Sequence, residues 1–234
     1  MRTLLVLFLY VIIAVLVIPL ILVCATFKWV YPLYFVGRTS INLGRLILSV
    51  RIEVVGLEKI GKQETYVFMP NHESFLDGPL MFVVTPQFMR VIQKKEIFRV
   101  PILAQGMKVA EFIPVDRKGR RGGREAIERA VRLIQSKKHS FLVFPEGTRT
   151  LDGKLQRFRR GGFFLALHSQ VPIVPVSING SFELMPKGSF FTKRGTIRVT
   201  LHDPVPMTGY SEGNLDELMD RVRNTVISGL EVRA

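Results

Sequence analysis

The pattern of apolar and polar residues divides the chain into two parts near residue 48. Residues 3–27 contain no charged side chain, and a second apolar stretch covers residues 29–36. From residue 51 onward, apolar runs of strand length alternate with helical patterns, which is typical of an α/β sheet covered by helices. We therefore expect hydrophobic membrane-anchoring helices over residues 1–48 and one α/β domain over residues 49–234, built as a single mixed sheet flanked by helices.

Seven apolar runs are predicted to form the strands of this sheet. The runs are residues 51–55, 66–69, 89–92, 111–115, 140–144, 173–178 and 196–201. Two further segments have the spacing of amphipathic helices that pack on a sheet. One is predicted over residues 124–138, and the other is predicted to follow an N-cap at Asn214.

The N-terminal apolar region has the length of a membrane segment. Residues 3–27 would measure about 37 Å as a helix, enough to cross a hydrocarbon layer. Pro19 and Pro32 interrupt the region, so it forms either a full span or a helical hairpin that enters one leaflet and returns. The lack of a small-x-small cleavage site argues against a cleaved signal peptide. Basic residues follow the run more than they precede it, which predicts an inner-membrane protein with its body on the cytoplasmic side.

The charge of the chain indicates anionic partners. Lys and Arg total 33 against 19 for Asp and Glu, a formal net charge of +14, which suits nucleic acid, anionic lipid headgroups or phosphorylated substrates. The densest basic stretches, residues 117–124 and 157–162, lack interleaved aromatic side chains beyond Phe158 and any helix-turn-helix or zinc pattern. We therefore expect membrane lipids and phosphorylated substrates as partners, and no nucleic acid.

Several other kinds of chemistry are disfavoured by the residues present. Cys24 is the single cysteine and lies in the apolar region, so an intrachain disulfide is excluded and a catalytic thiol is not expected. No Cys, His and carboxylate cluster has metal-ligand spacing, so no metal site is expected. Residues 56–63 resemble a phosphate-binding loop, but Gln63 stands where Ser or Thr would bind magnesium.

His72 and Asp77 follow the apolar run that ends at Pro70. Five residues correspond to about 140° around a helix, so the two side chains meet only if the chain turns before a helix begins. If they meet, Asp77 would fix the tautomer of His72, whose other nitrogen could then deprotonate a hydroxyl. No Gly-x-Ser-x-Gly motif is present, which favours direct attack of that hydroxyl on a thioester over an acyl-serine. On these residues alone, a structural cap is the alternative interpretation.

A second polar cluster follows the run that ends at Phe144. Gly147 permits close backbone approach, Thr148 can donate a hydrogen bond, and the planar guanidinium of Arg149 suits a phosphate. A solvated turn is the alternative for this cluster.

Four blocks in order, residues 71–77, 112–117, 144–149 and 171–176, closely resemble those of the glycerolipid acyltransferase family, and most closely those of its bacterial lysophosphatidic acid acyltransferases. The resemblance implies that His72 is a general base with Asp77 as its partner. It also implies that the acceptor's phosphate and glycerol are held by Arg117, Glu146, Gly147, Thr148 and Arg149, and that Pro175 shapes the acyl-donor side.

The activity implied by the resemblance is transfer of an acyl group from acyl-CoA or acyl-acyl carrier protein (acyl-ACP) to the free sn-2 hydroxyl of lysophosphatidic acid. The product would be phosphatidic acid, and the reaction would need no covalent acyl-enzyme, metal or cofactor. Two alternatives stay open. One is an acyltransferase for another lysophospholipid or an amino-acid lipid, and the other is a membrane-anchored polyanion-binding protein without enzymatic activity.

Overall fold

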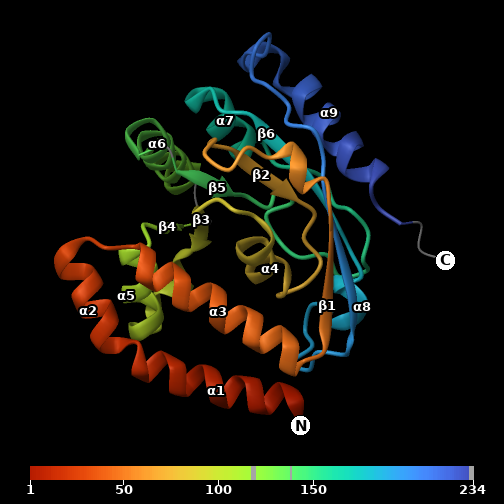
Figure 1. Ribbon diagram of the computed structural model, residues 1–234. Coiled ribbons are helices and arrows are strands. Elements are labelled where there is room, and N and C mark those ends of the chain that lie inside the picture. The colour runs from red at the N-terminus through yellow and green to blue at the C-terminus, as the bar shows by residue number, and fades with distance from the viewer. Residues whose placement is uncertain (117–119, 138, 232–234) are drawn as a thin grey trace.

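The computed structural model describes residues 1–116, 120–137 and 139–231. Its centre is one seven-stranded mixed sheet with the strand order β1-β7-β6-β2-β5-β3-β4 (Figure 1). The five strands from β6 to β4 run parallel, and β7 is antiparallel to β6 and parallel to β1. The strands are β1 (Val50–Val55), β2 (Val67–Pro70), β3 (Met89–Lys94), β4 (Ile113–Val115), β5 (Ser140–Leu142), β6 (Ile173–Asn179) and β7 (Gly195–Leu201). The prediction of a single mixed sheet is confirmed.

Two of the strands are shorter than predicted, and the backbone explains both differences. β4 begins at Ile113 because Glu111 has a φ of 59°, a left-handed conformation that a strand does not accommodate. β5 ends at Leu142, and Phe144 begins a turn in which its carbonyl accepts the N–H of Gly147 at 3.0 Å.

The central strands β2 and β6 are buried along their whole length, as expected for strands covered on both faces.

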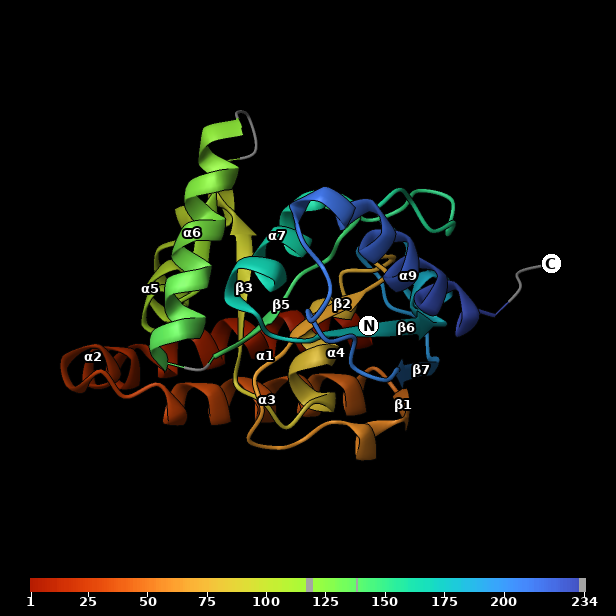
Figure 2. The same cartoon turned by 90° about the horizontal axis from the view of Figure 1, so that it is seen from above.

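Helices cover both faces of the sheet (Figure 2). On one face, α6, α7 and α9 contribute to a core around Val67, Phe141 and Ile173. On the other face, α4 and the N-terminal region pack against a core around Phe68, Val174 and Val199. The helices are α1 (Arg2–Leu16), α2 (Ile18–Phe27), α3 (Tyr31–Ile47), α4 (Asp77–Val84), α5 (Pro101–Val109), α6 (Arg120–Lys137), α7 (Arg160–Ser169), α8 (Ser181–Leu184) and α9 (Leu215–Ser228).

The predicted helix starts need two corrections. α6 begins at Arg120, four residues before the predicted start. Before α9, a short 3-10 helix over Glu212–Asn214 carries the cap: the Ser211 side chain accepts the Asn214 N–H, and Asn214 Oδ1 accepts the Ser211 N–H at 2.6 Å. Ser211 is therefore the capping residue, and the side chain of Asn214 makes no cap hydrogen bond to α9.

The N-terminal region folds as three helices, with α3 docked on the body of the protein. The hydroxyl of Tyr34 donates to the carbonyl of Gln87 at 2.9 Å, and Arg38 donates to that of Val83 at 3.0 Å. Among the described residues, no single helix is both long and apolar enough to cross a membrane. The pair α1 and α2, bent by 47° just before Pro19, meets that test of length and composition when taken together.

Candidate functional site

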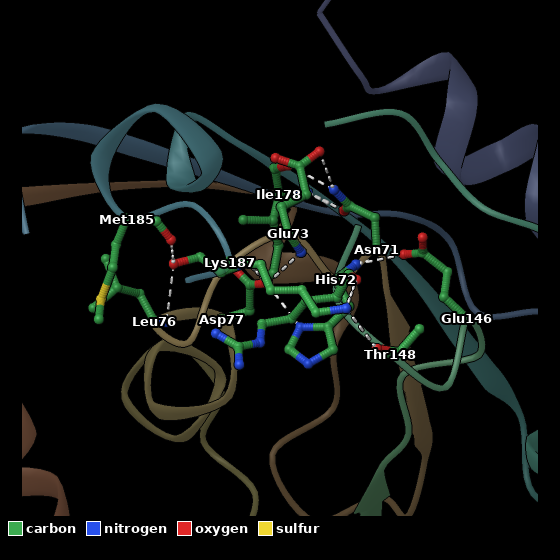
Figure 3. Close-up of polar contacts among 12 residues, drawn as sticks. Asn71, His72, Glu73, Leu76, Asp77, Glu146, Thr148, Ile178, Met185 and Lys187 are labelled. Atoms are coloured by element: carbon green, nitrogen blue, oxygen red, sulfur yellow. Dashed lines mark hydrogen bonds and ion pairs between the residues drawn. The ribbon is translucent and has the colours of Figure 1, made fainter. Parts of the chain in front are cut away.

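The candidate site lies at the edge of the sheet where β2 and β5 end. These strands are parallel neighbours, so the loops that follow them must meet. The loop after β2 carries His72 and leads into α4, which begins at Asp77. The loop after β5 carries Phe144 and the polar cluster up to Arg149. Polar segments separated by about seventy residues are therefore brought side by side (Figure 3).

His72 and Asp77 form the pair that the sequence predicted. His72 Nδ1 lies 2.9 Å from Asp77 Oδ2, because the chain turns before α4 begins. The same carboxylate oxygen accepts the backbone N–H groups of Glu73 at 2.7 Å and Ser74 at 2.8 Å. Asp77 is completely buried, whereas the His72 side chain is 19% exposed. The imidazole is thus oriented from inside the protein and still accessible.

Asn71 and Ser74 anchor the loop on either side of His72. The Asn71 amide accepts the N–H of Ile178 at 2.7 Å and donates to its carbonyl at 2.9 Å, which ties the end of β2 to β6. The Ser74 hydroxyl donates to the carbonyl of Met185 at 2.8 Å. Both residues are buried. Their side chains hold the loop through these hydrogen bonds.

The loop after β5 supports His72 from the other side. The Phe144 ring stacks on the imidazole, with the centroids 3.8 Å apart and the planes 20° apart. Glu146 accepts the backbone N–H of His72 at 2.6 Å, and Thr150 donates its N–H to the His72 carbonyl at 3.0 Å. The position of His72 is therefore fixed through both its backbone and its ring.

Glu146 is buried beside His72 and contacts the protein backbone. Glu146 is 2% exposed. One carboxylate oxygen accepts the N–H of His72, and the other accepts the backbone N–H of Gln156 at 2.8 Å. Burial raises the pKa of Glu146 to about 7, although the N–H groups of Gln156 and His72 pull it down. Both oxygens contact backbone groups of the protein, so contact of Glu146 with an acceptor stays a prediction.

Gly147, Thr148 and Arg149 lie beside His72 on the wall of a cavity. Gly147 has a φ of 73°, and a Cβ atom there would lie 2.9 Å from Arg159 Nε, so both backbone and space favour glycine. The guanidinium carbon of Arg149 lies 6.0 Å from the ring centroid of Phe75.

Two cationic residues near this turn were not assigned to the site by sequence reasoning. Arg159 packs against Gly147, and its place in the basic stretch 157–162 was the available signal. Lys187 donates to the Thr148 hydroxyl at 3.3 Å and to the Arg149 carbonyl at 3.1 Å (Figure 3). Lys187 lies in a loop far along the chain, so no local pattern pointed to it.

Pro175 and Arg117 are the other two predicted site residues. Pro175 is buried in β6, with its carbonyl accepting the N–H of His202 at 3.0 Å. β6 begins to pair with β7 only at the next residue, Val176, so the missing N–H of the proline is tolerated there. Arg117 lies outside the described residues.

The cavity that contains His72 has a volume of about 1640 Å³ and a mainly apolar lining. It extends from His72 along α4 and α5 to the N-terminal helices, where Val11, Ile21 and Leu33 form part of the wall. A polar site and a long apolar space are therefore continuous, as a substrate with a charged head and a hydrocarbon tail requires.

The remaining histidines form local pairs. His139 contacts Glu111 at 3.1 Å, His168 contacts Glu212 at 2.9 Å, and His202 contacts the Ser177 hydroxyl at 2.8 Å. Within the described ranges, no group of three or more His, Cys, Asp or Glu side chains is arranged to hold a metal ion.

Comparisons with known proteins give a consistent match. A family model described as Acyltransferase matches residues 51–179. A chloroplastic 1-acyl-sn-glycerol-3-phosphate acyltransferase of Brassica napus is 31% identical over 184 residues, which cover 78% of this chain and 52% of that protein. One from Arabidopsis thaliana is 34% identical over 157 residues, covering 66% of this chain and 44% of that protein. The chain spans about half the length of these relatives.

A solved structure matches over nearly the whole chain. The crystal structure of PlsC, the 1-acyl-sn-glycerophosphate (LPA) acyltransferase from Thermotoga maritima, has a TM-score of 0.81 and 26% sequence identity to this chain. The match covers 97% of this chain and 92% of that one, so the N-terminal helices belong to the shared architecture.

Proposed function

This chain belongs to the acyltransferase family, and on that premise we propose that it transfers a fatty acyl group from acyl-CoA or acyl-ACP to the free sn-2 hydroxyl of lysophosphatidic acid. The product is phosphatidic acid. The observation that carries the proposal is the 2.9 Å contact between His72 Nδ1 and the buried Asp77, on the wall of an apolar cavity and beside Arg149. The names of the relatives support the choice of acceptor.

In the proposed reaction, His72 is a general base. Its Nδ1–H donates to Asp77, which leaves Nε2 as the acceptor for the proton of the acyl-acceptor hydroxyl. The hydroxyl oxygen attacks the thioester carbonyl and forms a tetrahedral intermediate. When the carbon–sulfur bond breaks, the imidazolium returns the proton to the leaving thiolate. The atoms balance without a covalent acyl-enzyme, and the proposed reaction needs no metal or cofactor.

Cationic groups near the Gly147 turn are proposed to hold the acceptor's phosphate. Arg149 supplies a planar guanidinium that can bind two phosphate oxygens at once. Arg159 lies against the same turn, and Arg117, from the second family block, is proposed to complete the phosphate site. Thr148 already accepts a hydrogen bond from Lys187, so Lys187 is positioned to orient this turn.

The apolar part of the cavity is proposed to hold the acyl chain. Moving a sixteen-carbon chain from an apolar phase into water costs about 0.8 kcal/mol per methylene, in total more than about 10 kcal/mol. A cavity that continues to the N-terminal helices keeps the chain in an apolar environment during transfer. We place α1 and α2 in the lipid of a membrane, because several apolar side chains of α1, including Leu4 and Phe8, are more than half exposed. We place the α/β body on the cytoplasmic side of the inner membrane, because basic residues follow the apolar run more than they precede it.

The proposal is tested by acyl transfer with the purified full-length chain and a panel of acceptors. Lysophosphatidic acid, a lysophosphatidylcholine and an amino-acid lipid are each supplied with acyl-CoA and with acyl-ACP. We expect lysophosphatidic acid to be preferred, because the phosphate site recognises a terminal phosphate. Preference for the zwitterionic acceptor would contradict the proposed substrate, and absence of transfer with every pair would contradict the proposed activity.

A further inference from the structure

A second cavity, of about 730 Å³, lies at the opposite edge of the sheet from His72. One wall comes from the amino ends of β2 and β5, where Glu64 and Ser140 lie, whereas His72 follows the carboxyl end of β2. The other wall includes Lys28 and Trp29, at the junction between α2 and α3. Among the described residues, none lines both cavities, so the second one is separate from the catalytic site.

Cationic side chains from several segments converge on this cavity. Lys28, Lys62 and Lys108 are exposed at its rim, and they come from the α2–α3 junction, the loop before β2 and α5. Two carboxylates also line it, and both have partners: Glu64 accepts the Tyr66 hydroxyl, and Glu111 contacts His139 and Arg90. An excess of positive charge therefore remains in the cavity.

Arg90 is the unusual member of the lining. It is 1% exposed, yet its Nε and Nη1 have no hydrogen-bond partner in the part of the chain that the structure describes. Its contact with Glu111 is long, at 3.5 Å, and Glu111 is also 3.1 Å from His139. Burial lowers the pKa of Arg90, and Glu111 only partly opposes that effect. An anion in the adjacent cavity would stabilise this buried guanidinium.

We propose that the second cavity binds the phosphate group of an anionic phospholipid. Lysine ammonium groups above a guanidinium are suited to a phosphate. The source is assigned to a lipid because Trp29 and Tyr31, which are 59% and 64% exposed, line the cavity directly after the apolar helix α2. Aromatic and basic side chains at the end of an apolar helix are typical of the membrane–water interface. The bound headgroup would hold the body against the leaflet, independently of His72.

Trp29 is the single tryptophan of the chain, so its fluorescence reports on this cavity. The full-length protein in neutral detergent is titrated with dihexanoyl phosphatidylglycerol, dihexanoyl phosphatidylcholine and inorganic phosphate. We expect a saturable emission change with phosphatidylglycerol only. A triple variant, Lys28→Gln with Lys62→Gln and Lys108→Gln, removes the three lysines of the rim and is called the rim variant. It should bind phosphatidylglycerol about tenfold more weakly or worse than the wild type.

A matched control removes three exposed charges that line neither cavity, Lys59→Gln with Arg132→Gln and Lys154→Gln, and should bind phosphatidylglycerol like the wild type. Arg90→Gln should also weaken binding, and the rim variant decides the question if Arg90→Gln does not fold. Acyl transfer by the rim variant in detergent should be unchanged, which separates this proposal from the proposed function. Wild-type affinity in the rim variant, or an equal response to phosphatidylcholine or inorganic phosphate, would overturn the proposal.

Discussion

Asp77 Oδ2 accepts three hydrogen bonds, from His72 Nδ1 and from the backbone N–H groups of Glu73 and Ser74. The two backbone bonds build the turn before α4, and the third fixes the orientation of the imidazole. One carboxylate oxygen therefore both holds the turn before α4 and is available for the role proposed for it in catalysis. The two backbone donors precede the helix, and α4 has no side-chain cap hydrogen bond.

Replacing Asp77 with Asn keeps the shape of this side chain and removes its charge. The amide oxygen can still accept the three hydrogen bonds of Oδ2, but a neutral amide would stabilise the imidazolium of the proposed mechanism less than a carboxylate does. We expect turnover to fall by about 10²- to 10⁴-fold, with little change in the KM for either substrate. Steady-state kinetics and a thermal melt check this, and an unchanged turnover number in a folded variant would contradict the role of Asp77.

The buried Glu146 predicts a pH dependence of stability. Its pKa is about 7 in the folded protein and about 4.5 when solvated, so the folded state binds more protons between these values. The free energy of unfolding should therefore fall as pH rises from about 5 to 8, by up to about 3 kcal/mol from this group. Denaturant titrations at several pH values give the free energy of unfolding of the wild type and of Glu146→Gln, and the variant should lack the part of the pH dependence that comes from Glu146. Parallel curves of unfolding free energy against pH for the two proteins would contradict this prediction.

The residues that sequence reasoning identified correctly as neighbours are those close together in the chain. His72 and Asp77 are joined by one turn, and turn-forming residues beside them indicated that turn. Glu146 lies at the site because β5 is the neighbour of β2 in the sheet. Lys187 lies there because the loop after α8 contacts the turn at Arg149. No local pattern encodes the contact of Glu146 with the His72 backbone, and for that reason its burial was not predicted.

At the scale of elements, the sheet was predictable because buried strands appear as continuous apolar runs. Each of the seven predicted runs contains a strand of the sheet. The residues at which β4 begins and β5 ends depend on backbone conformation, which the pattern of apolar residues does not predict. The positive φ of Glu111 shortened β4, and the turn at Phe144 shortened β5. The strand order was not predictable, since adjacency of β2, β5 and β6 depends on contacts between distant segments.

The turn after β5 gives a prediction at this scale. Gly147→Ala places a side chain on a residue with a φ of 73°, in contact with Arg159. We expect a loss of stability of about 1–2 kcal/mol and a higher KM for the acceptor, because Arg159 must move. Gly123→Ala, in α6 with nothing within 4 Å of the new Cβ, should instead stabilise the protein by about 0.5–1 kcal/mol. Thermal melts and the KM for the acceptor are measured for both variants. Equal changes in melting temperature and in KM would contradict the conclusion that Gly147 is required by its backbone conformation and by its contact with Arg159.

At the scale of the molecule, one cavity connects the polar site around His72 with the apolar N-terminal helices. The cavity that contains His72 extends to α1 and α2, and under the proposed placement of these helices in lipid, a lipid substrate would enter it without crossing water. The sequence predicted the apolar segment, and the structure divides it into two helices bent by 47°. That bend follows from Pro19, which the sequence also contains.

Membrane association is predicted to depend on exposed α1 side chains that do not line the catalytic cavity. Replacing Leu4, Leu5 and Phe8, which are 58%, 49% and 63% exposed, with Gln should abolish flotation with vesicles. The matched control replaces Val54, Val55 and Leu57 with Gln, and it should float like the wild type. Transfer between short-chain soluble substrates should survive in both variants. Flotation of the α1 variant would show that these side chains do not anchor the protein.

The central claim, that His72 is the base for acyl transfer, is tested most directly by replacing it with Ala. We predict that His72→Ala retains the wild-type melting profile and loses at least about 10²-fold in turnover with lysophosphatidic acid. His202→Gln, a substitution outside both cavities, should keep wild-type turnover. A folded His72→Ala variant that transfers acyl groups at the wild-type rate would contradict the account.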